Sequence, residues 1–481
     1  MAESTPLLKA SDLPLKEIPG SYGPVFWGAF KDKMDFYWRE GTPKFYETRR
    51  DKYKSTVYRT NVAPGPPGFS NPQVVMLLDQ KSYPILFDVS KVEKRDVFTG
   101  TYMPSTKYNG GYRILPYLDP SEEKHTKTKE FCFDVLKLSV PRILPSFHSA
   151  ISECFNSWEA ALAKSGKVNF ATALTPATFK FNVKAFIGRD PTEAGTNSLG
   201  TSGPTYTQLW QFPQIAPILV VPVPKILIPL AEVVVHTFPI PFLFVKYFYG
   251  KLTKFFQTYA TELLDLAESK HGLGREEATH NLLFYTLFNS WGGINIFFPG
   301  MLKRLGALSP EEQLEVANDV RKAISAEGGL TLKALSQMTL VTSLVYEALR
   351  IDPPVPFQYA HAKMDLVIES HDSSFSVKKG EMLAGYMPLA CKDPVVFKEP
   401  DTFLPKRFMG DGSKLLKYVL WSNGPQTEEP STSNKHCAGK DFILTMGPLF
   451  VAEIYSRYDY MQIDADGNLT ILTKKRIPRR A

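Results

Sequence analysis

Residues 433–441 read SNKHCAGKD, and this stretch sets a single cysteine, Cys437, between basic residues and a glycine. An apolar run suited to a helix follows, so Cys437 is predicted to lie near a helix N-terminus. The helix dipole and the neighbouring Lys435 and Lys440 would then stabilise its thiolate. No Cys or His stands at a metal-site spacing from it. Such an isolated thiolate can serve as the axial ligand of a haem iron.

The composition argues against several other classes of protein. The chain has 481 residues, 43% of them hydrophobic and 22% charged, as in ordinary globular proteins. Its net charge of +7 is spread along the sequence without a stripe of Arg and Lys, which argues against binding to nucleic acid. Four scattered cysteines without a C-x-x-C pair argue against a disulfide framework and a structural zinc site. They favour a reducing compartment.

The N-terminal half of the chain contains both strand and helix signals. Residues 55–60 and 72–78 are β-rich and flank the turn sequence APGPPG, which predicts strand, turn and strand. A helix is predicted to begin after Pro120, and the run at 151–166 is predicted to end as a helix at Gly166.

The C-terminal half is predicted to be mostly helical. A long apolar helix is predicted at 274–300, interrupted at Gly292 and Gly293, and an amphipathic helix at 333–351. Alternating runs at 365–370 and 375–386 then predict a hairpin. Helices outnumber strands, so the fold class is mainly α with a minor β part.

The region 201–245 is apolar but rich in proline. No charged residue occurs between Thr201 and Pro224, and the prolines beyond would break any membrane-spanning helix repeatedly. Two interpretations remain open: a buried, kinked connector, or an exposed apolar lip over a pocket that rests on a membrane surface.

Two further features lie in a fixed order before the cysteine. Glu347 and Arg350 form an E-x-x-R pair on one helix face, and Arg407 follows in DTFLPKRFMG. Alone, the pair reads as a solvated salt bridge. Together with Cys437, these residues resemble the haem-thiolate cytochrome P450 superfamily over nearly the whole chain. The resemblance implies one cytochrome P450-like domain over 1–481, β-rich at about 50–90 and in C-terminal hairpins and helical elsewhere. It also implies haem b bound by Cys437, with Glu347, Arg350 and Arg407 in the core behind it.

Two departures from the superfamily narrow the resemblance. The long helix reads FNSWGGI at 288–294, without the acid and threonine that oxygen-activating members carry. Cys437 also lies about nine residues farther from Gly424 than in the usual motif. Both departures are similar to the plant branch that rearranges fatty-acid hydroperoxides, namely allene oxide synthases, hydroperoxide lyases and divinyl ether synthases. Such a chain would use a substrate that brings its own O–O bond.

Within that branch, allene oxide synthases carry phenylalanine where lyases tend to have leucine, and this chain has Phe98 in DVFTGTYMP. NKHCAGKDF and GGYRILPYLDPSEEKH also look like signatures of the branch. Pro116, Pro356 and His361 depart from residues that are more usual there. The resemblance therefore implies an allene oxide synthase, with a hydroperoxide lyase or a divinyl ether synthase as the alternative. A haem- or lipid-binding protein without turnover is the second alternative.

The resemblance also implies roles for individual side chains. Asn289 would handle the hydroperoxide, and Phe98 would present its π-face to the electron-poor carbon. By themselves, Asn289 could cap its own helix backbone, Phe98 could be a core aromatic, and His125 could be a solvated helix residue. The cations expected to hold the haem propionates are Lys94, His125, Lys129 and His361.

The implied substrate is a polyunsaturated fatty-acid hydroperoxide, such as 13-hydroperoxylinolenic acid, converted to an allene oxide and water in oxylipin and jasmonate-type biosynthesis. No dioxygen, NADPH or reductase is expected. The first 20 residues lack an apolar signal segment, so a plastid or cytoplasmic protein without a transmembrane anchor is expected. Peripheral membrane or lipid contact is expected through 213–245.

Overall fold

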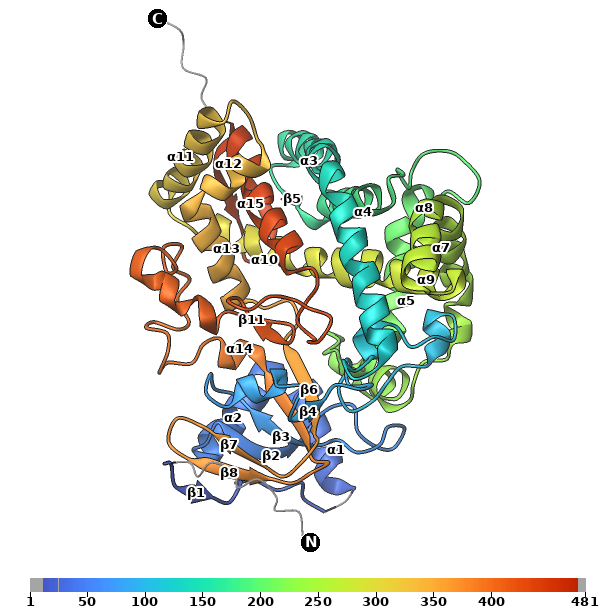
Figure 1. The fold of residues 1–481 in the computed structure, drawn as a ribbon. Coiled ribbons are helices and arrows are strands. Elements are labelled where there is room, and N and C mark those ends of the chain that lie inside the picture. The colour runs from blue at the N-terminus through green and yellow to red at the C-terminus, as the bar shows by residue number, and fades with distance from the viewer. Residues whose placement is uncertain (1–11, 25, 475–481) are drawn as a thin grey trace, which may run out of the picture.

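The structure, a computed structural model, describes residues 12–24 and 26–474 and is predominantly helical, with its five-stranded sheet at one end (Figure 1). This confirms the predicted mainly α fold with a minor β part. The first 11 residues, on which part of the expectation about localisation rests, lie outside the described residues. The α-helices are α1 (Trp27–Met34), α2 (Thr42–Tyr53), α3 (Glu123–Ser165), α4 (Ala171–Ile187), α5 (Gly203–Ile215), α6 (Ile228–Ala231), α7 (Lys246–Tyr259), α8 (Thr261–His271), α9 (Arg275–Leu283), α10 (Gly292–Gly306), α11 (Pro310–Ala326), α12 (Leu332–Gln337), α13 (Thr339–Ile351), α14 (Met387–Ala390) and α15 (Lys440–Arg457).

The largest sheet joins the two ends of the chain. Its strand order is β2-β3-β9-β6-β4, so strands from the first hundred residues pair with strands that follow α13. The strands of the described chain are β1 (Leu15–Lys16), β2 (Val57–Asn61), β3 (Gln73–Leu77), β4 (Val92–Glu93), β5 (Val168–Asn169), β6 (Phe357–Ala362), β7 (Leu366–Glu369), β8 (Ser374–Val377), β9 (Met382–Tyr386), β10 (Leu420–Trp421), β11 (Gly424–Pro425), β12 (Tyr458–Ile463) and β13 (Asn468–Lys474).

The predicted strand, turn and strand at the N-terminal end are confirmed. β2 and β3 pair antiparallel, with Val57 opposite Leu77 and Asn61 opposite Gln73. The predicted hairpin at 365–386 is only half right. β7 and β8 pair as expected, but β9 leaves them and enters the larger sheet between β3 and β6. The alternating pattern predicts a strand at each run but contains no signal for the partner of the last one.

Helix α3 spans both helical signals of the N-terminal half. It runs for 43 residues from Glu123, through Pro141 and Pro145, to a C-cap at Gly166. Gly166 has φ of 70°, the left-handed conformation that glycine adopts most easily at a helix end. It packs most extensively against α4, and in Figure 1 these two helices lie between α15 on one side and α7, α8 and α9 on the other.

The long apolar helix passes through the middle of the molecule. α9 is followed directly by a π-helical stretch, η10 (Phe284–Trp291), and then by α10. The predicted interruption at Gly292 is therefore wrong, because the chain stays helical there and only its hydrogen-bond pattern changes. π-Helical stretches are rare and occur frequently at functional sites.

The apolar region 201–245 is not a buried connector. It is divided into short helices, including α5, α6 and the π-helical η8 (Glu232–Thr237), as its prolines require. Many of its large apolar side chains are exposed, with Ile226 at 87% and Leu243 at 77%. The interpretation as an exposed apolar lip agrees with this geometry. Among the described residues, no helix combines the length and the apolarity that crossing a bilayer needs.

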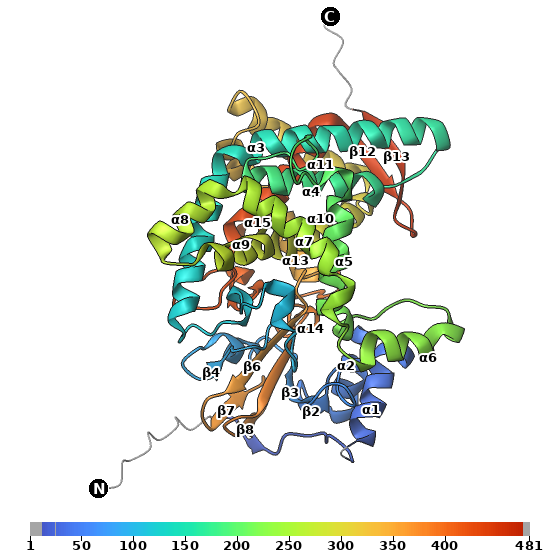
Figure 2. The same ribbon diagram turned by 90° about the vertical axis from the view of Figure 1, so that its right-hand side faces the viewer.

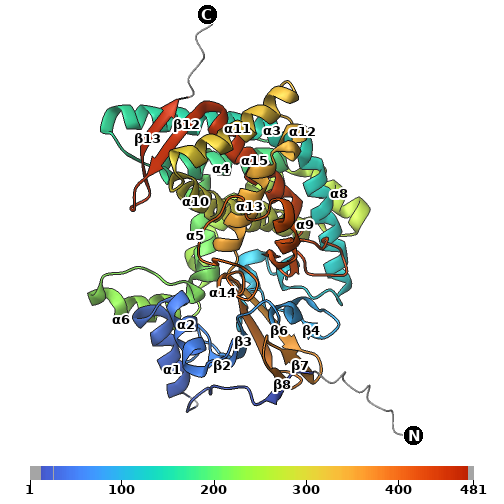
Figure 3. The ribbon, with the colours of Figure 1, turned by 90° about the vertical axis from the view of Figure 1, so that its left-hand side faces the viewer.

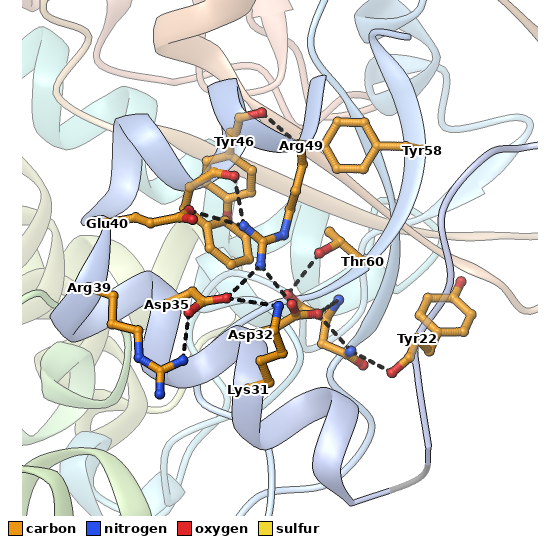
Figure 4. Close-up of polar contacts among 12 residues, drawn as sticks. Tyr22, Lys31, Asp32, Asp35, Arg39, Glu40, Tyr46, Arg49, Tyr58 and Thr60 are labelled. Atoms are coloured by element: carbon orange, nitrogen blue, oxygen red, sulfur yellow. Dashed lines mark hydrogen bonds and ion pairs between the residues drawn. The ribbon is translucent and has the colours of Figure 1, made fainter. Parts of the chain in front are cut away.

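A buried ion cluster fixes the N-terminal helices to the sheet (Figure 4). The guanidinium of Arg49, on α2, lies 2.7 Å from Asp32 and 3.4 Å from Asp35 and also contacts Glu40. Asp32 in turn accepts a hydrogen bond from the side-chain amide of Asn61 at the end of β2. One arginine therefore connects α1, η1 (Asp35–Arg39), α2 and β2.

Replacing Arg49 with Met leaves Asp32 and Asp35 without their shared partner. We expect a loss of about 3 kcal/mol in the free energy of unfolding, because breaking a buried ion pair strands its charge. The neighbouring Arg50 pairs with Asp51 at the surface, so R50M should cost less than about 1 kcal/mol. Urea unfolding of both variants checks this, and equal losses would contradict it.

Candidate functional site

Cys437 lies in the loop between a short hairpin and α15. Strands β10 and β11 form the hairpin, and the backbone N–H of Cys437 donates to the carbonyl of Ser422 at 2.9 Å. Gly424 lets the loop approach the hairpin, because a Cβ there would lie 2.6 Å from the buried ring of His436. Burial raises the pKa of the half-buried Cys437 thiol, whereas the Gly439 N–H and Lys129 act in the opposite direction. The backbone hydrogen bond to Ser422 thus fixes the position of Cys437 in the loop.

The basic neighbours of the cysteine do not act as expected. The ammonium of Lys440 is buried and lies 2.8 Å from both the Glu428 carbonyl and the Glu429 carboxylate. It therefore closes the inserted loop at 426–434 rather than facing the thiol. Lys435 donates to three backbone carbonyls of residues 115–118. The prediction that Lys435 and Lys440 stabilise the thiolate directly is thus wrong, and Lys129 is the cation that faces it.

Glu347, Arg350 and Arg407 meet in a fully buried cluster. Both carboxylate oxygens of Glu347 accept hydrogen bonds from Arg350, at 2.7 and 2.8 Å, and from Arg407, at 3.0 Å. The same carboxylate accepts the backbone N–H of Leu404. The arginines use their remaining N–H groups on carbonyls of residues 391–402. Taken alone, the Glu347–Arg350 pair suggested a salt bridge exposed to solvent, whereas the structure shows it fully buried.

Three lysines gather near the cysteine without an acidic partner. The ammonium of Lys94 donates to the Tyr359 carbonyl at 2.8 Å, and that of Lys129 donates to the Asn434 carbonyl at 2.6 Å. With Lys435, they form no ion pair to a carboxylate of the described chain. Burial lowers the pKa of Lys129 to about 8 and, with the charge of Lys129, that of Lys435 to about 7. The pKa of Lys94 falls well below its usual range for the same reason.

This arrangement fits a cofactor that carries carboxylates. Buried cations are normally paired, so three unpaired ones need an anion that the chain itself does not provide. In addition, buried His125 has no partner for Nδ1 in the described chain, and Tyr117 has none for its hydroxyl. The two propionates of a haem would satisfy such donors while its iron faced Cys437. The predicted propionate residues thus come from two segments around one cation-rich site, Lys94 from the loop after β4 and His125 and Lys129 from α3.

The structure shows no contact that tests the expected role of His361, whereas it gives Lys435 different contacts from those expected. His361 is half-buried on β6, opposite Glu93 of β4, and its ring forms no hydrogen bond within the described chain, so its role stays a prediction. The sequence predicted that Lys435 stabilises the Cys437 thiolate, and it did not predict that Lys435 joins Lys94 and Lys129 in the group of unpaired lysines. Its position two residues before Cys437 was the signal that could have found it.

Pro116 shows why one departure from the family pattern is tolerated. It sits in a 3₁₀ turn at Leu115–Tyr117, and its carbonyl accepts a hydrogen bond from Lys435 at 3.2 Å. Because the contact uses the backbone carbonyl, a proline at this position preserves it.

Phe98 packs against aromatic residues of the helix that carries Asn289. The ring of Phe98 packs edge-on against Phe284 and Phe288, with centroids 6.2 and 6.1 Å apart. Phe288 directly precedes Asn289 in the π-helical stretch. Asn289 is exposed although Leu287 and Trp291 beside it are buried, and its amide forms no side-chain hydrogen bond in the described chain. It therefore does not cap its own helix, and it is free to bind a ligand.

A pocket of about 390 Å³ opens beyond Phe98. Its lining comes from 101–105, which follows Phe98, and from the apolar region at Pro213, Pro217 and Pro239. Phe69 and Tyr102 face one another in its wall. Its walls combine such apolar groups with the hydroxyl-bearing side chains of Ser70, Thr101 and Ser105, so the pocket can receive both an apolar chain and polar groups.

Comparisons with known proteins agree over nearly the whole chain. The cytochrome P450 family model matches residues 305–427. Allene oxide synthases from Parthenium argentatum and Arabidopsis thaliana, the second named chloroplastic, are both 49% identical, over 94% and 95% of this chain and 95% and 87% of theirs. A divinyl ether synthase from Selaginella moellendorffii is 42% identical over 94% of this chain and 92% of its own. The retinoic acid-bound cyanobacterial CYP120A1 has the same fold, with a TM-score of 0.63, 17% identity and 94% of each chain covered.

The contact between Gly424 and His436 predicts a test of the cysteine loop. The variant G424A should lower haem occupancy several-fold, because the added methyl group would push His436 and the adjoining Cys437 out of position. Gly329 has open space around it and an ordinary backbone conformation, so G329A is the control. The Soret absorbance per mole of purified protein measures occupancy, and equal values for both variants would contradict the prediction.

Proposed function

The chain belongs to the family of cytochromes P450 that includes the plant allene oxide synthases, and from this premise we propose that it dehydrates a polyunsaturated fatty-acid hydroperoxide to an allene oxide. The reaction removes one water from the hydroperoxide, so atoms and electrons balance without dioxygen, NADPH or a reductase. The observation that carries the proposal is Phe98 packed against Phe288, the residue before the exposed Asn289, on a helix that has neither the acid nor the threonine of an oxygen-activating member.

Haem b is the cofactor that we propose for this site. When bound, it would supply the one-electron chemistry that opens the O–O bond of the substrate. Cys437 would hold the iron, and Lys94, Lys129 and Lys435 would hold the propionates. His125 and His361 complete the proposed set of cofactor residues.

The substrate-facing residues have separate tasks. Asn289 offers both a donor and an acceptor, so it can hold the hydroperoxide group in place. Phe98 presents a π-face, which stabilises positive charge that develops on the neighbouring carbon of the acyl chain. Loss of a proton from the carbon next to that one then forms the double bond of the allene oxide. Recombination of the carbon-centred radical would instead lead to cleavage products.

Two alternatives follow from the same site. A hydroperoxide lyase or a divinyl ether synthase would use the same substrate and cofactor. The similarity to the Selaginella protein supports the divinyl ether synthase as an alternative. A haem- or lipid-binding protein would retain the hydroperoxide without turnover. Phe98 favours the dehydratase among the three.

The place of the enzyme in the cell is part of the proposal. We place it in oxylipin biosynthesis of the jasmonate type, in the plastid, as the name of the Arabidopsis relative suggests, with the cytoplasm as the alternative. The exposed apolar side chains within 213–245 support contact with lipid, from which a fatty-acid substrate would come.

Product analysis tests the proposed reaction. The purified holoenzyme is given the 13-hydroperoxide of linolenic acid without NADPH, and products are identified by mass spectrometry. We expect the conjugated-diene absorbance to fall and α-ketols and cyclopentenones, which form from an allene oxide, to appear. Short-chain aldehydes or a divinyl ether would favour the first alternative, and retained hydroperoxide the second.

Replacing Phe98 with Leu tests its role directly. We expect F98L to shift products from α-ketols toward aldehydes by at least severalfold, because the π-face beside the reacting carbon is lost. The variant F284L removes an aromatic partner of Phe98 but leaves Phe98 in place, so its product ratio should stay close to that of the parent. An unchanged ratio in F98L would remove Phe98 from the mechanism.

A further inference from the structure

The π-helical stretch η10 is contacted by two neighbouring helices. Both α4 and α5 pack against it, and α10 continues from its C-terminal end (Figure 2 and Figure 3). In a regular α-helix each backbone carbonyl accepts the N–H four residues on, whereas a π-helical turn holds one more residue and changes these pairs. Carbonyls in such a stretch can therefore accept a further hydrogen bond from a side chain outside the helix.

Two side-chain amides donate to consecutive carbonyls of this stretch. Asn182, on α4, is fully buried and donates its amide N–H to the carbonyl of Thr286. The side-chain oxygen of Asn182 accepts the hydroxyl of Ser290 at 2.7 Å. Gln211, on α5, donates its amide N–H to the carbonyl of Leu287 at 2.9 Å. Because Thr286 and Ser290 are four residues apart, Asn182 binds both ends of one helical turn.

The turn that Asn182 binds carries Asn289. The side chain of Asn289 is exposed, whereas Thr286 is buried and Ser290 is half-buried against α4. A regular α-helix would hold one residue fewer in this stretch, so side chains at its two ends would be rotated by about 100° relative to one another. Phe284, which packs on Phe98, lies at the start of the stretch, and Asn289 lies near its end. The π-helical form therefore sets the direction of Asn289 relative to the aromatic residues around Phe98.

Gly292 leaves room for one of these contacts. Its backbone N–H donates to the carbonyl of Leu287, five residues before it, and so closes the π-helical turn. A Cβ at Gly292 would lie 3.3 Å from the amide nitrogen of Gln211 and 3.7 Å from the Leu287 carbonyl oxygen. A side chain at this position would crowd the carbonyl that both donors share. The glycine and Gln211 thus serve the same turn.

A further contact of α4 lies outside the π-helical stretch. The hydroxyl of Thr175, on α4, donates to the side-chain oxygen of Asn295 at 3.2 Å. Asn295 belongs to the regular helix α10. This contact joins the same two segments of chain as that of Asn182, but it reaches no carbonyl of the π-helical stretch. It is therefore a matched control for the contacts of Asn182 and Gln211.

We propose that Asn182 and Gln211 are positioning residues, which hold 284–291 in its π-helical form and thereby direct Asn289 toward the hydroperoxide group of the substrate. Asn182 is fully buried, so it acts through Asn289 and not on the substrate itself. An amide suits this task, because it offers a donor and an acceptor without bringing a charge into the core. The proposal deepens the proposed function and rests on it for the substrate, whereas the contacts with the helix are independent of it.

Hydrogen exchange measured by mass spectrometry on the holoenzyme tests the hold on the helix without any substrate. We expect N182L and Q211L to exchange the backbone amides of 286–292 severalfold faster than the parent, because the π-helical turn opens more often once a side-chain partner is lost. T175V removes the contact with α10 and should leave the exchange of these amides unchanged. Gln211 is half-buried, so Q211L carries the test if leucine at the buried position 182 prevents folding. Exchange in Q211L equal to that of T175V would overturn the proposal.

Steady-state kinetics with the 13-hydroperoxide of linolenic acid test the effect on Asn289. We expect kcat of Q211L to fall roughly tenfold or more, because a small misplacement of a group that holds the reacting atoms is costly. KM should change by less than about twofold, since the acyl chain binds elsewhere in the site. T175V should keep both parameters of the parent, and all variants should keep its Soret absorbance per mole of protein. A raised KM at unchanged kcat, or a fall in kcat that only follows loss of haem, would contradict the positioning role.

The two experiments separate this proposal from the proposed function. A parent enzyme without turnover would overturn the proposed function, while faster exchange in Q211L would still support the hold on the helix. Faster exchange in Q211L together with a kcat equal to that of the parent would leave the reaction intact and overturn the positioning role.

Discussion

The carboxylate of Glu347 is buried between two arginines, and much of the site depends on that arrangement. Arg350 comes from the same helix, whereas Arg407 comes from a loop that precedes the cysteine hairpin. Phe408, next to Arg407, donates its backbone N–H to Ser343 on that helix, so α13 holds this loop at two points. Removing one member would strand a buried charge at a cost of about 3–5 kcal/mol. The cluster therefore fixes the approach of the chain to Cys437.

Two groups of side chains lack a suitable partner within the described chain: buried lysines without a carboxylate, and large apolar side chains exposed to water. Each group indicates a kind of molecule that the protein binds. Lys94 and Lys129 are buried cations with only carbonyl partners, which an anionic cofactor would neutralise. On the outside, Trp27 and Ile226 expose apolar surface that water does not favour, and a lipid phase would cover it. The pocket between 101–105 and the prolines of the apolar region offers a further place for a ligand.

The sequence predicted those features that depend on a few neighbouring residues or on motifs that follow one another in a fixed order. The helix end at Gly166, the paired strands at 57–77 and the order of Glu347, Arg407 and Cys437 all belong to this class. It could not choose between a buried and an exposed region at 201–245, because burial depends on what packs against a segment. Likewise, the partner of a lysine is set by elements hundreds of residues away, as the contacts of Lys440 and of Lys33 with Glu232 show.

The assignment of Cys437 as the iron ligand is the centre of this account, and iron X-ray absorption of the holoprotein tests it most directly. Burial and the neighbouring Cys437 raise the pKa of Cys132 on α3, so Cys132 lies near Cys437 and is the rival ligand among the four free cysteines. We predict one sulfur scatterer near 2.3 Å from the iron in the parent and in C132A, roughly the length of a metal–thiolate bond. In C437S that scatterer should be absent. Its persistence in C437S, or its loss in C132A, would contradict the account.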